Sequence, residues 1–244
     1  MTPAADAPVL WVTGAGSGIG RAVAVRAAGL GSRVALSGRR PAAVTETGEL
    51  IAKAGGRSLV LPLDATDRAA VRAAHETITA TWGGVTQLVL AAGLNTPQRY
   101  WRDQSIGQFE QIVATNLTAV ARVIDAVLPD MRAAGYGHIV VVSSYAAWSF
   151  SPHAGVAYSA GKSALSAVCR TLNEQEAGHG IRSCHLCPGD VDTDFLRLRP
   201  RVPDQAARTV MLSPDDVASA VLYALSVPAH VRIDELVISP MSQT

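Results

Sequence analysis

The chain has 244 residues, 48% hydrophobic and 17% charged, enough apolar sequence to fill the core of one globular domain. Lys+Arg total 21 against Asp+Glu 20, so the formal net charge of +1 gives no electrostatic case for binding nucleic acid or an anionic membrane surface. Met1–Pro8 lacks the features of a signal peptide, and apolar runs such as Ile139–Val142 are too short to span a bilayer. Three cysteines cannot form a complete disulfide framework, so we expect a cytoplasmic protein.

Short apolar runs alternate with helical stretches along the whole chain. The expected strands are Val9–Thr13, Arg33–Ser37, Ser58–Leu63, Gln87–Ala91, His138–Ser143, Ile181–Cys187 and Ile233–Ile238. The expected helices are Ile19–Leu30, one opened by Pro41, Asp67–Thr81, Ser105–Ala134 with an interruption near Pro129, Val156–Gly178 and Pro214–Ser226. This order predicts an α/β fold, a single-domain Rossmann fold over residues 1–244 with a doubly wound parallel sheet of about seven strands.

A glycine-rich loop, Thr13-Gly14-Ala15-Gly16-Ser17-Gly18-Ile19-Gly20, joins the first strand to the first helix. Glycine there permits a tight turn and a close approach to a pyrophosphate, and the helix N-terminus supplies unpaired N–H donors. The spacing predicts a dinucleotide site. The alternative is a glycine-rich turn without a ligand. The expected contacts are Gly14, Ser17, Gly18, Ile19 and Gly20.

Tyr158 and Lys162 lie four residues apart in an expected helix, so they share one face of it. A free phenol titrates near pH 10, too high for efficient acid/base work at neutral pH. A nearby ammonium favours the phenolate, so we expect Lys162 to lower the pKa of Tyr158. Many helices carry this pair by chance, and it gains meaning only with the glycine loop.

The loop and the Tyr/Lys pair together resemble the short-chain dehydrogenase/reductase family, over nearly the whole chain. The resemblance implies an NAD(P)(H)-dependent oxidoreductase that interconverts a carbonyl and a secondary alcohol, with Tyr158 as the acid/base, Lys162 bound to the nicotinamide ribose, and no metal. Ser144 would assist the tyrosine, with Ser143 as the alternative. Asn116 would hold a water that links Lys162 to solvent. A non-catalytic dinucleotide-binding sensor or scaffold is the competing hypothesis.

The same resemblance implies further cofactor contacts along the edge of the sheet. Asp64, followed by Ala65, stands where the family contacts adenine. Ala92 and Gly93 follow the fourth strand, where Ala91 departs from the usual Asn-Ala-Gly. The segment from Pro188 to Thr193 matches P-G-x-V-x-T, which assigns Pro188, Val191 and Thr193 to the nicotinamide end.

The end of the second strand indicates the cofactor. No acidic residue lies between Gly20 and Glu46, so the carboxylate that normally binds the ribose 2′-hydroxyl of NAD is missing. Arg39 and Arg40 stand there instead, and arginine suits a 2′-phosphate. We therefore expect NADP(H) to be preferred over NAD(H), with Arg39 as the main contact. Stacking of arginine on adenine would allow both cofactors.

The substrate is a small carbonyl or alcohol that the sequence does not name. Residues 232–240 resemble the ending of bacterial dehydrogenases of 3-hydroxy acids and serine. An apolar pocket with aromatic walls is expected from Tyr100, Trp101, Tyr145, Trp148 and Phe150, although Trp148 and Phe150 could instead face a second subunit. Family habit suggests a homotetramer or homodimer.

Two further segments bear on the site. Residues 192–212, which contain several arginines interleaved with aspartates, are expected to form a solvated substrate lid, with anion binding as the alternative. Cys184 and Cys187 resemble a C-x-x-C element, but in a strand residues three apart point to opposite faces. We therefore expect buried thiols there, not a redox or metal pair.

Overall fold

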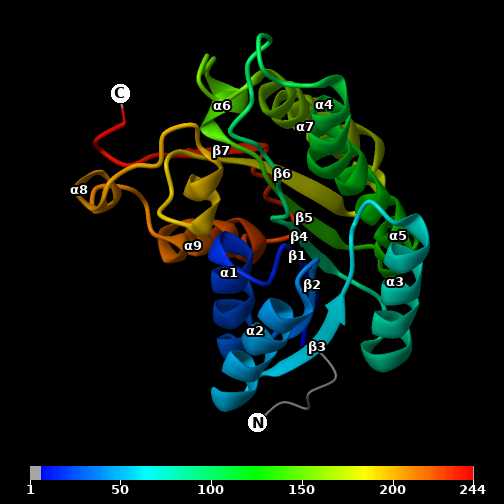
Figure 1. Cartoon of the computed structure of the whole chain (residues 1–244). Coiled ribbons are helices and arrows are strands. Elements are labelled where there is room, and N and C mark those ends of the chain that lie inside the picture. Colours follow the sequence, from blue (N-terminus) through cyan, green and yellow to red (C-terminus); the bar gives the residue numbers. More distant parts are fainter. Residues whose placement is uncertain (1–6, 244) are drawn as a thin grey trace.

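The structure, a computed structural model, describes residues 7–243, so residues 1–6 of the segment screened for a signal peptide lie outside it. One sheet of seven parallel strands, in the order β3-β2-β1-β4-β5-β6-β7, forms the centre of the fold (Figure 1). The strands are β1 (Val9–Thr13), β2 (Arg33–Gly38), β3 (Arg57–Pro62), β4 (Gln87–Leu90), β5 (Gly137–Val142), β6 (Ile181–Pro188) and β7 (Glu235–Ile238). The predicted doubly wound parallel sheet is confirmed.

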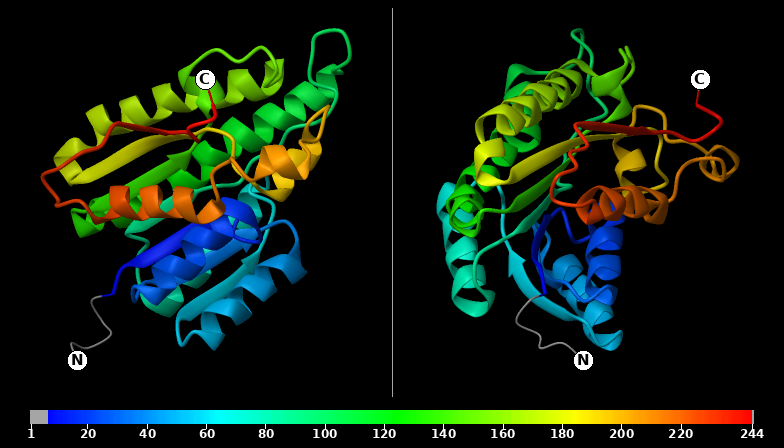
Figure 2. Two further views of the ribbon diagram at one scale, coloured as in Figure 1. Left: turned by 90° about the vertical axis from the view of Figure 1, so that its left-hand side faces the viewer. Right: turned by 180° about the vertical axis from the view of Figure 1, so that it is seen from behind.

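Helices cover both faces of the sheet (Figures 1 and 2). One layer holds α1 (Gly18–Gly29), α2 (Pro41–Lys53) and α9 (Pro214–Ser226). The other holds α3 (Arg68–Trp82), α4 (Ile106–Val113), α5 (Ala119–Ala134) and α7 (Val156–Gln175). Successive side chains of a strand point to opposite faces of the sheet. In β1, Leu10 and Val12 therefore pack against the first helical layer and Trp11 packs against the second.

The chain reverses its direction of winding between β1 and β4, which are neighbours in the sheet. At such a point the loops that follow the two strands diverge and leave a crevice at the carboxyl edge of the sheet. Short helices lie around that edge: α6 (Tyr145–Trp148), a 3₁₀ turn η3 (Asp194–Leu198) and α8 (Gln205–Arg208). A further 3₁₀ turn, η2 (Ala177–His179), follows α7 on the way to β6.

The long helical region is interrupted, but not at Pro129 as expected. Helix α5 continues through Pro129. Proline has no N–H to donate to the carbonyl four residues earlier, and Pro129 lies on the exposed side of the helix, where water can bind that carbonyl. The interruption is a π-helical turn, η1 (Ala114–Thr118), between α4 and α5. Asn116 lies in this turn and is fully buried.

By length and composition alone, Ile106–Ala134 could cross a membrane, a test that the core helix of a globular protein also passes. In the fold its apolar side is used for packing. Val123, Val127 and Met131 are buried against the sheet, whereas Asp125 and Arg132 are exposed. This is the pattern of a helix that covers one face of a sheet.

His138 in β5 makes the stability of the fold depend on pH. It is 1% exposed, and its Nδ1 atom has no hydrogen-bond partner. Burial, reinforced by the positive charge of Arg182, lowers the pKa of His138 from 6.5 to about 4. Between these values the unfolded chain binds a proton that the folded chain does not, so stability is full above pH 6.5 and falls as the pH drops toward 4.

We expect the free energy of unfolding to fall by about 2 kcal/mol between pH 7 and pH 5 because of this one side chain. In His138→Gln most of that loss should vanish, as measured by urea unfolding at the two pH values. His230→Gln, at an exposed position, is the matched control and should keep the wild-type dependence. An unchanged pH dependence in His138→Gln would contradict the assignment.

Candidate active site

A cleft of about 1450 Å³ follows the carboxyl edge of the sheet, at the crevice between β1 and β4. Every residue predicted to bind the cofactor lines it. These residues are Gly14, Ser17, Gly18, Ile19, Gly20, Arg39, Asp64, Ala65, Ala92, Gly93, Tyr158, Lys162, Pro188, Val191 and Thr193. Segments from six different parts of the sequence therefore converge on one elongated site.

The glycine loop is shaped so that side chains would collide with backbone. Gly14 has φ +70°, and a Cβ atom there would lie 2.7 Å from the carbonyl carbon of Ala91. A Cβ atom on Gly20 would lie 2.3 Å from the carbonyl oxygen of Gly14. The loop thus brings the start of α1 against the end of β1, with backbone N–H groups at the helix start. These features fit the pyrophosphate of a dinucleotide.

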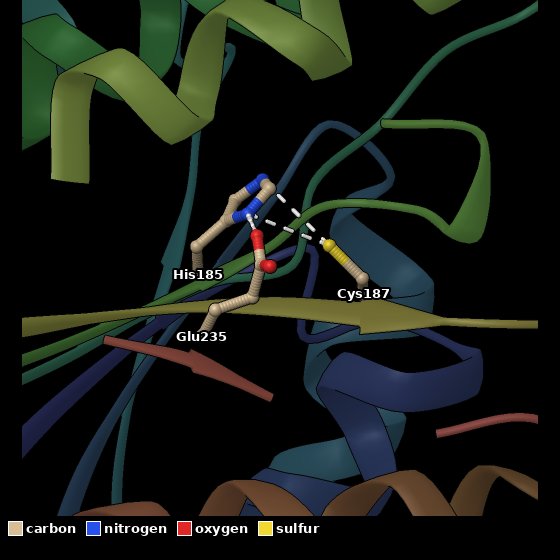
Figure 3. A group of neighbouring side chains, drawn as sticks. All are labelled: His185, Cys187 and Glu235. Atoms are coloured by element: carbon tan, nitrogen blue, oxygen red, sulfur yellow. Dashed lines mark hydrogen bonds and ion pairs between the residues drawn. The ribbon is translucent and has the colours of Figure 1, made fainter. Parts of the chain in front are cut away.

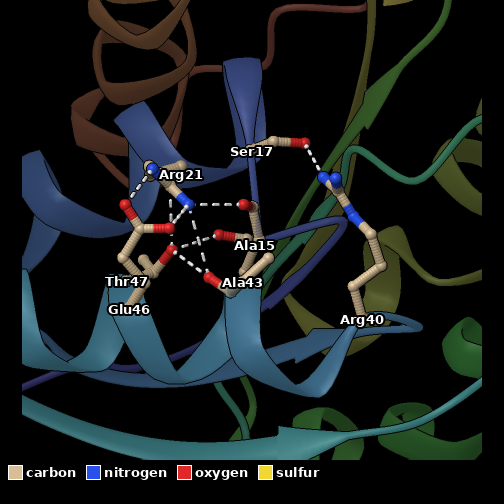
Figure 4. Close-up of polar contacts among 8 residues, drawn as sticks. Ala15, Ser17, Arg21, Arg40, Ala43, Glu46 and Thr47 are labelled. Atoms are coloured by element: carbon tan, nitrogen blue, oxygen red, sulfur yellow. Dashed lines mark hydrogen bonds and ion pairs between the residues drawn. The ribbon is translucent and has the colours of Figure 1, made fainter. Parts of the chain in front are cut away.

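Two side chains that the sequence analysis did not identify, Arg21 and Thr47, donate hydrogen bonds to the backbone of the glycine loop (Figure 4). Arg21 donates to the carbonyl oxygen of Gly16 at 2.8 Å and forms an ion pair with Glu46 at 2.7 Å. The buried hydroxyl of Thr47 donates to the carbonyl oxygen of Ala15 at 2.9 Å. These contacts join the loop to α2. No local pattern reveals the contacts with α2, because 25 residues separate Arg21 from Glu46 and 32 separate Thr47 from Ala15.

The two arginines after β2 are exposed and take different positions. Arg40 donates from Nη2 to the hydroxyl of Ser17 in the glycine loop, at 2.9 Å (Figure 4). The charge of Arg39 instead acts on Asp64. Although burial raises the pKa of Asp64, hydrogen bonds from Thr66 and the charge of Arg39 lower that pKa overall. Positive charge therefore flanks both the loop and the expected adenine position.

Tyr158 lies in the first turn of α7, and its hydroxyl is within hydrogen-bonding reach of Ser144. Ser144 follows β5 and caps α6 by accepting a hydrogen bond from the N–H of Ala146 at 3.2 Å. Ser143 points away into the fold, where its hydroxyl donates to the carbonyl oxygen of Lys162 at 3.1 Å. Of the two serine candidates, Ser144 is the one that faces the tyrosine.

The pKa of Tyr158 is raised, contrary to the expectation that Lys162 would lower it. Burial of the phenol raises it, and the hydrogen bond with Ser144 and the charges of Arg99 and Arg199 oppose that effect only in part. The Nζ atom of Lys162 lies 6.0 Å from the centre of the phenol ring. A protonated phenol is the form that can donate a proton to a carbonyl oxygen.

Lys162 and Asn116 both lie close to Gly93: a Cβ atom there would be 3.8 Å from the Nζ atom of Lys162 and 3.8 Å from the Oδ1 atom of Asn116. The Nζ atom of Lys162 donates to the carbonyl oxygen of Val142 at 2.7 Å, and burial lowers the pKa of Lys162 to about 8. The side-chain amide of Asn116 makes paired hydrogen bonds, both of 2.8 Å, with the backbone of Leu94. Asn116 thus fixes the segment after β4, and its predicted water remains a prediction.

The segment predicted as a lid begins beside the glycine loop. The Cγ2 atom of Thr193 lies 3.1 Å from where a Cβ atom of Gly18 would stand. Two of the arginines in this region form ion pairs with aspartates of the preceding loop: Arg199 with Asp190, and Arg208 with Asp192 at 2.6 Å. The basic stretch is therefore partly neutralised within the fold.

Only part of the expected aromatic wall lines the cleft. Tyr100 and Tyr145 do, together with Phe195, whose ring centre lies 6.0 Å from that of Tyr158. Trp101, Trp148 and Phe150 do not line it, and they are 82%, 52% and 86% exposed. The expectation of a cleft walled by all five aromatic residues is therefore wrong.

His185, Cys187 and Glu235 form a small cluster on neighbouring strands beneath the site (Figure 3). His185 Nδ1 lies 2.9 Å from a carboxylate oxygen of Glu235 and 3.4 Å from the sulfur of Cys187. Burial raises the pKa of the Cys187 thiol to about 12, whereas a metal ligand must be a thiolate. Cys184 packs on the opposite face, as the strand geometry predicts.

A parallel sheet with a glycine loop at its switch point defines the class of Rossmann-fold proteins. The profile of the short chain dehydrogenase family matches residues 8–201. The chain is also 33% identical, over 95% of its length, to a glycine betaine reductase of Emericella nidulans, of which it spans only 18%. The chain therefore belongs to the short chain dehydrogenase family, a family of oxidoreductases.

Two solved structures show the same fold at similar identity. A serine dehydrogenase in a closed form with NADP⁺ is 28% identical, with a TM-score of 0.88 over 97% of this chain and 96% of the other. An alcohol dehydrogenase of Thermococcus sibiricus with 5-hydroxy-NADP is 28% identical, with a TM-score of 0.86 over 98% and 99% of the two chains.

Proposed function

We propose that this chain is an NADP(H)-dependent oxidoreductase that interconverts a carbonyl and a secondary alcohol, with Tyr158 as the acid/base. The convergence of Ser144, Tyr158 and Lys162 in a cleft that also contains the glycine loop carries this proposal. All three side chains that the chemistry requires are present. This disfavours a sensor or scaffold without catalysis.

The residues divide the work of carbonyl reduction. The cofactor, when bound, supplies a hydride to the carbonyl carbon. Ser144 donates a hydrogen bond to the carbonyl oxygen, and the Tyr158 hydroxyl delivers a proton to that oxygen as the alcohol forms. Lys162 is held by the carbonyl of Val142 with donors left for the ribose hydroxyls. In alcohol oxidation the same groups act in reverse.

NADPH oxidation across a panel of aldehydes and ketones tests the activity directly. The sensor hypothesis predicts dinucleotide binding without turnover of any member. The two similar structures described with NADP⁺ and 5-hydroxy-NADP support the choice of cofactor.

We expect kcat/KM to be at least about tenfold higher with NADPH than with NADH, because no carboxylate opposes the 2′-phosphate. Arg39→Ala and Arg40→Ala should each reduce kcat/KM with NADPH by about tenfold, the size of one charge-assisted hydrogen bond. The value with NADH should change little.

Arg57→Ala, which removes an exposed charge at the start of β3, is the matched control. A wild-type preference for NADH would contradict the cofactor assignment. An equal loss with both cofactors would mean that the arginine contacts adenine and not the 2′-phosphate. The two single variants rank Arg39, the main candidate, against Arg40, which already reaches the glycine loop.

A further inference from the structure

Arg99 is a buried cation in the wall of the cleft. It is 5% exposed, and it lines the cleft together with Tyr158. Its backbone carbonyl accepts a hydrogen bond from the N–H of Val156 at 3.0 Å, at the start of α7. A Cβ atom on Gly155 would lie 2.6 Å from the Cβ atom of Arg99. Arg99 is thereby fixed beside the helical turn that carries Tyr158.

The guanidinium of Arg99 has neutral partners only. Its Nε atom donates to the carbonyl oxygen of Thr96 at 2.8 Å, and its Nη2 atom donates to that of Leu198. Within residues 7–243 no carboxylate pairs with it, and its Nη1 atom has no hydrogen-bond partner. A buried charge without a counter-ion is costly to a fold, and such a charge in a ligand cleft indicates an anionic ligand.

The other charges at this end of the cleft do not supply that counter-ion. Asp190 is paired with Arg199, and Asp194 with Arg197. Arg102 and Arg201 line the cleft at exposed positions and add positive charge. The part of the cleft around Tyr158 is therefore net positive. Among the described residues, two of its cations are buried without a carboxylate partner: Lys162, 4% exposed, which the proposed function assigns to the cofactor, and Arg99, 5% exposed.

We propose that Arg99 binds a carboxylate of the substrate, so that the enzyme reduces an oxo acid to a hydroxy acid or catalyses the reverse. This rests on the proposed function and adds the substrate class to it. A planar carboxylate matches the donors that a guanidinium presents on one edge, and one buried cation balances one negative charge. An oxo acid differs from the apolar or aromatic carbonyl that the pocket expected from the sequence would favour, and that expectation stays a prediction.

The wild-type enzyme tests the proposal with pairs of oxo acids and their methyl esters, which share a carbon skeleton and differ in charge. We expect kcat/KM to favour the acid by about 30-fold or more for the best pair, the effect of a desolvated charge pair. Equal or better turnover of the esters would overturn this inference and leave the proposed function standing. No turnover of either member of any pair would also overturn this inference, whereas the proposed function is decided separately by the panel of aldehydes and ketones.

Arg99→Met identifies the residue responsible. It should lower kcat/KM for the acid by about 30-fold or more and kcat/KM for the ester much less, so that the acid-to-ester ratio collapses. Arg57→Met removes the same charge at the opposite edge of the sheet and should keep the wild-type ratio. NADPH titration reports whether each variant is folded. If Arg99→Met does not fold, Arg99→Gln, which also removes the charge, replaces it, and a ratio unchanged in the folded variant would overturn the role of Arg99.

Oxo phosphate monoesters complete the panel, because guanidinium also binds phosphate. At neutral pH they are mostly dianions, and two negative charges need more positive charge than Arg99 alone supplies. We expect them to be poorer substrates than the oxo acids. A preference for the phosphate monoesters would overturn the assignment to a carboxylate.

Discussion

Tyr158→Phe should lower kcat by about 100-fold or more while dissociation constants for NADPH stay within about threefold of wild type. The substitution keeps the ring and removes the proton that the phenol delivers, and general acid catalysis contributes about 10²–10⁴-fold. The phenol is protonated at neutral pH because burial raises its pKa, so the wild-type group is in the donating form.

Steady-state rates and fluorescence titration of NADPH measure the two effects separately. Tyr223→Phe, on the exposed side of α9, is the matched control and should keep kcat within about twofold. If Tyr158→Phe kept more than about a tenth of the wild-type kcat, a loss below about 1.4 kcal/mol, Tyr158 would not be the acid.

Gly20→Ala should weaken NADPH binding by at least about tenfold and destabilise the fold by about 1–3 kcal/mol. The new Cβ atom would lie 2.3 Å from the carbonyl oxygen of Gly14, so the loop or the helix must shift. Helix propensity acts in the opposite direction, since alanine in a helix is favoured over glycine by about 0.5–1 kcal/mol.

Gly29→Ala is the matched control in the same helix, because no atom lies within 4 Å of its added Cβ. It should stabilise the fold slightly and leave NADPH binding unchanged. Urea unfolding and calorimetric titration of both variants make the comparison. Wild-type affinity in Gly20→Ala would mean that the close approach of loop and helix is not needed for binding.

The sequence predicted those parts of the site whose residues lie within one helix or one strand–turn–helix unit. Tyr158 and Lys162 share a helix, and the glycines lie in one strand–turn–helix unit, so spacing alone predicts their neighbourhood. The continuous apolar runs likewise predict a buried parallel sheet. Each of these predictions depends on residues that are close in the chain.

The missed features depend on residues far apart or on small energy differences. Arg99 gains its meaning from Leu198 and from the absence, among the described residues, of a carboxylate beside it, which no spacing encodes. The π-helical turn at Asn116 consists of residues that also suit an α-helix, so only tertiary packing decides between them. The pKa of Tyr158 depends on how deeply the fold buries it, and the sequence shows only its charged neighbour.

The 3₁₀ turn η3 connects the two ends of the cleft. Thr193, just before it, lies against Gly18 of the dinucleotide loop, and Leu198, at its end, is bonded to Arg99. Ligands at the two ends of the cleft would therefore contact segments that this one short element joins. Any effect of cofactor binding on substrate affinity that is carried through η3 must appear, by thermodynamic linkage, as an equal effect of the substrate on cofactor affinity.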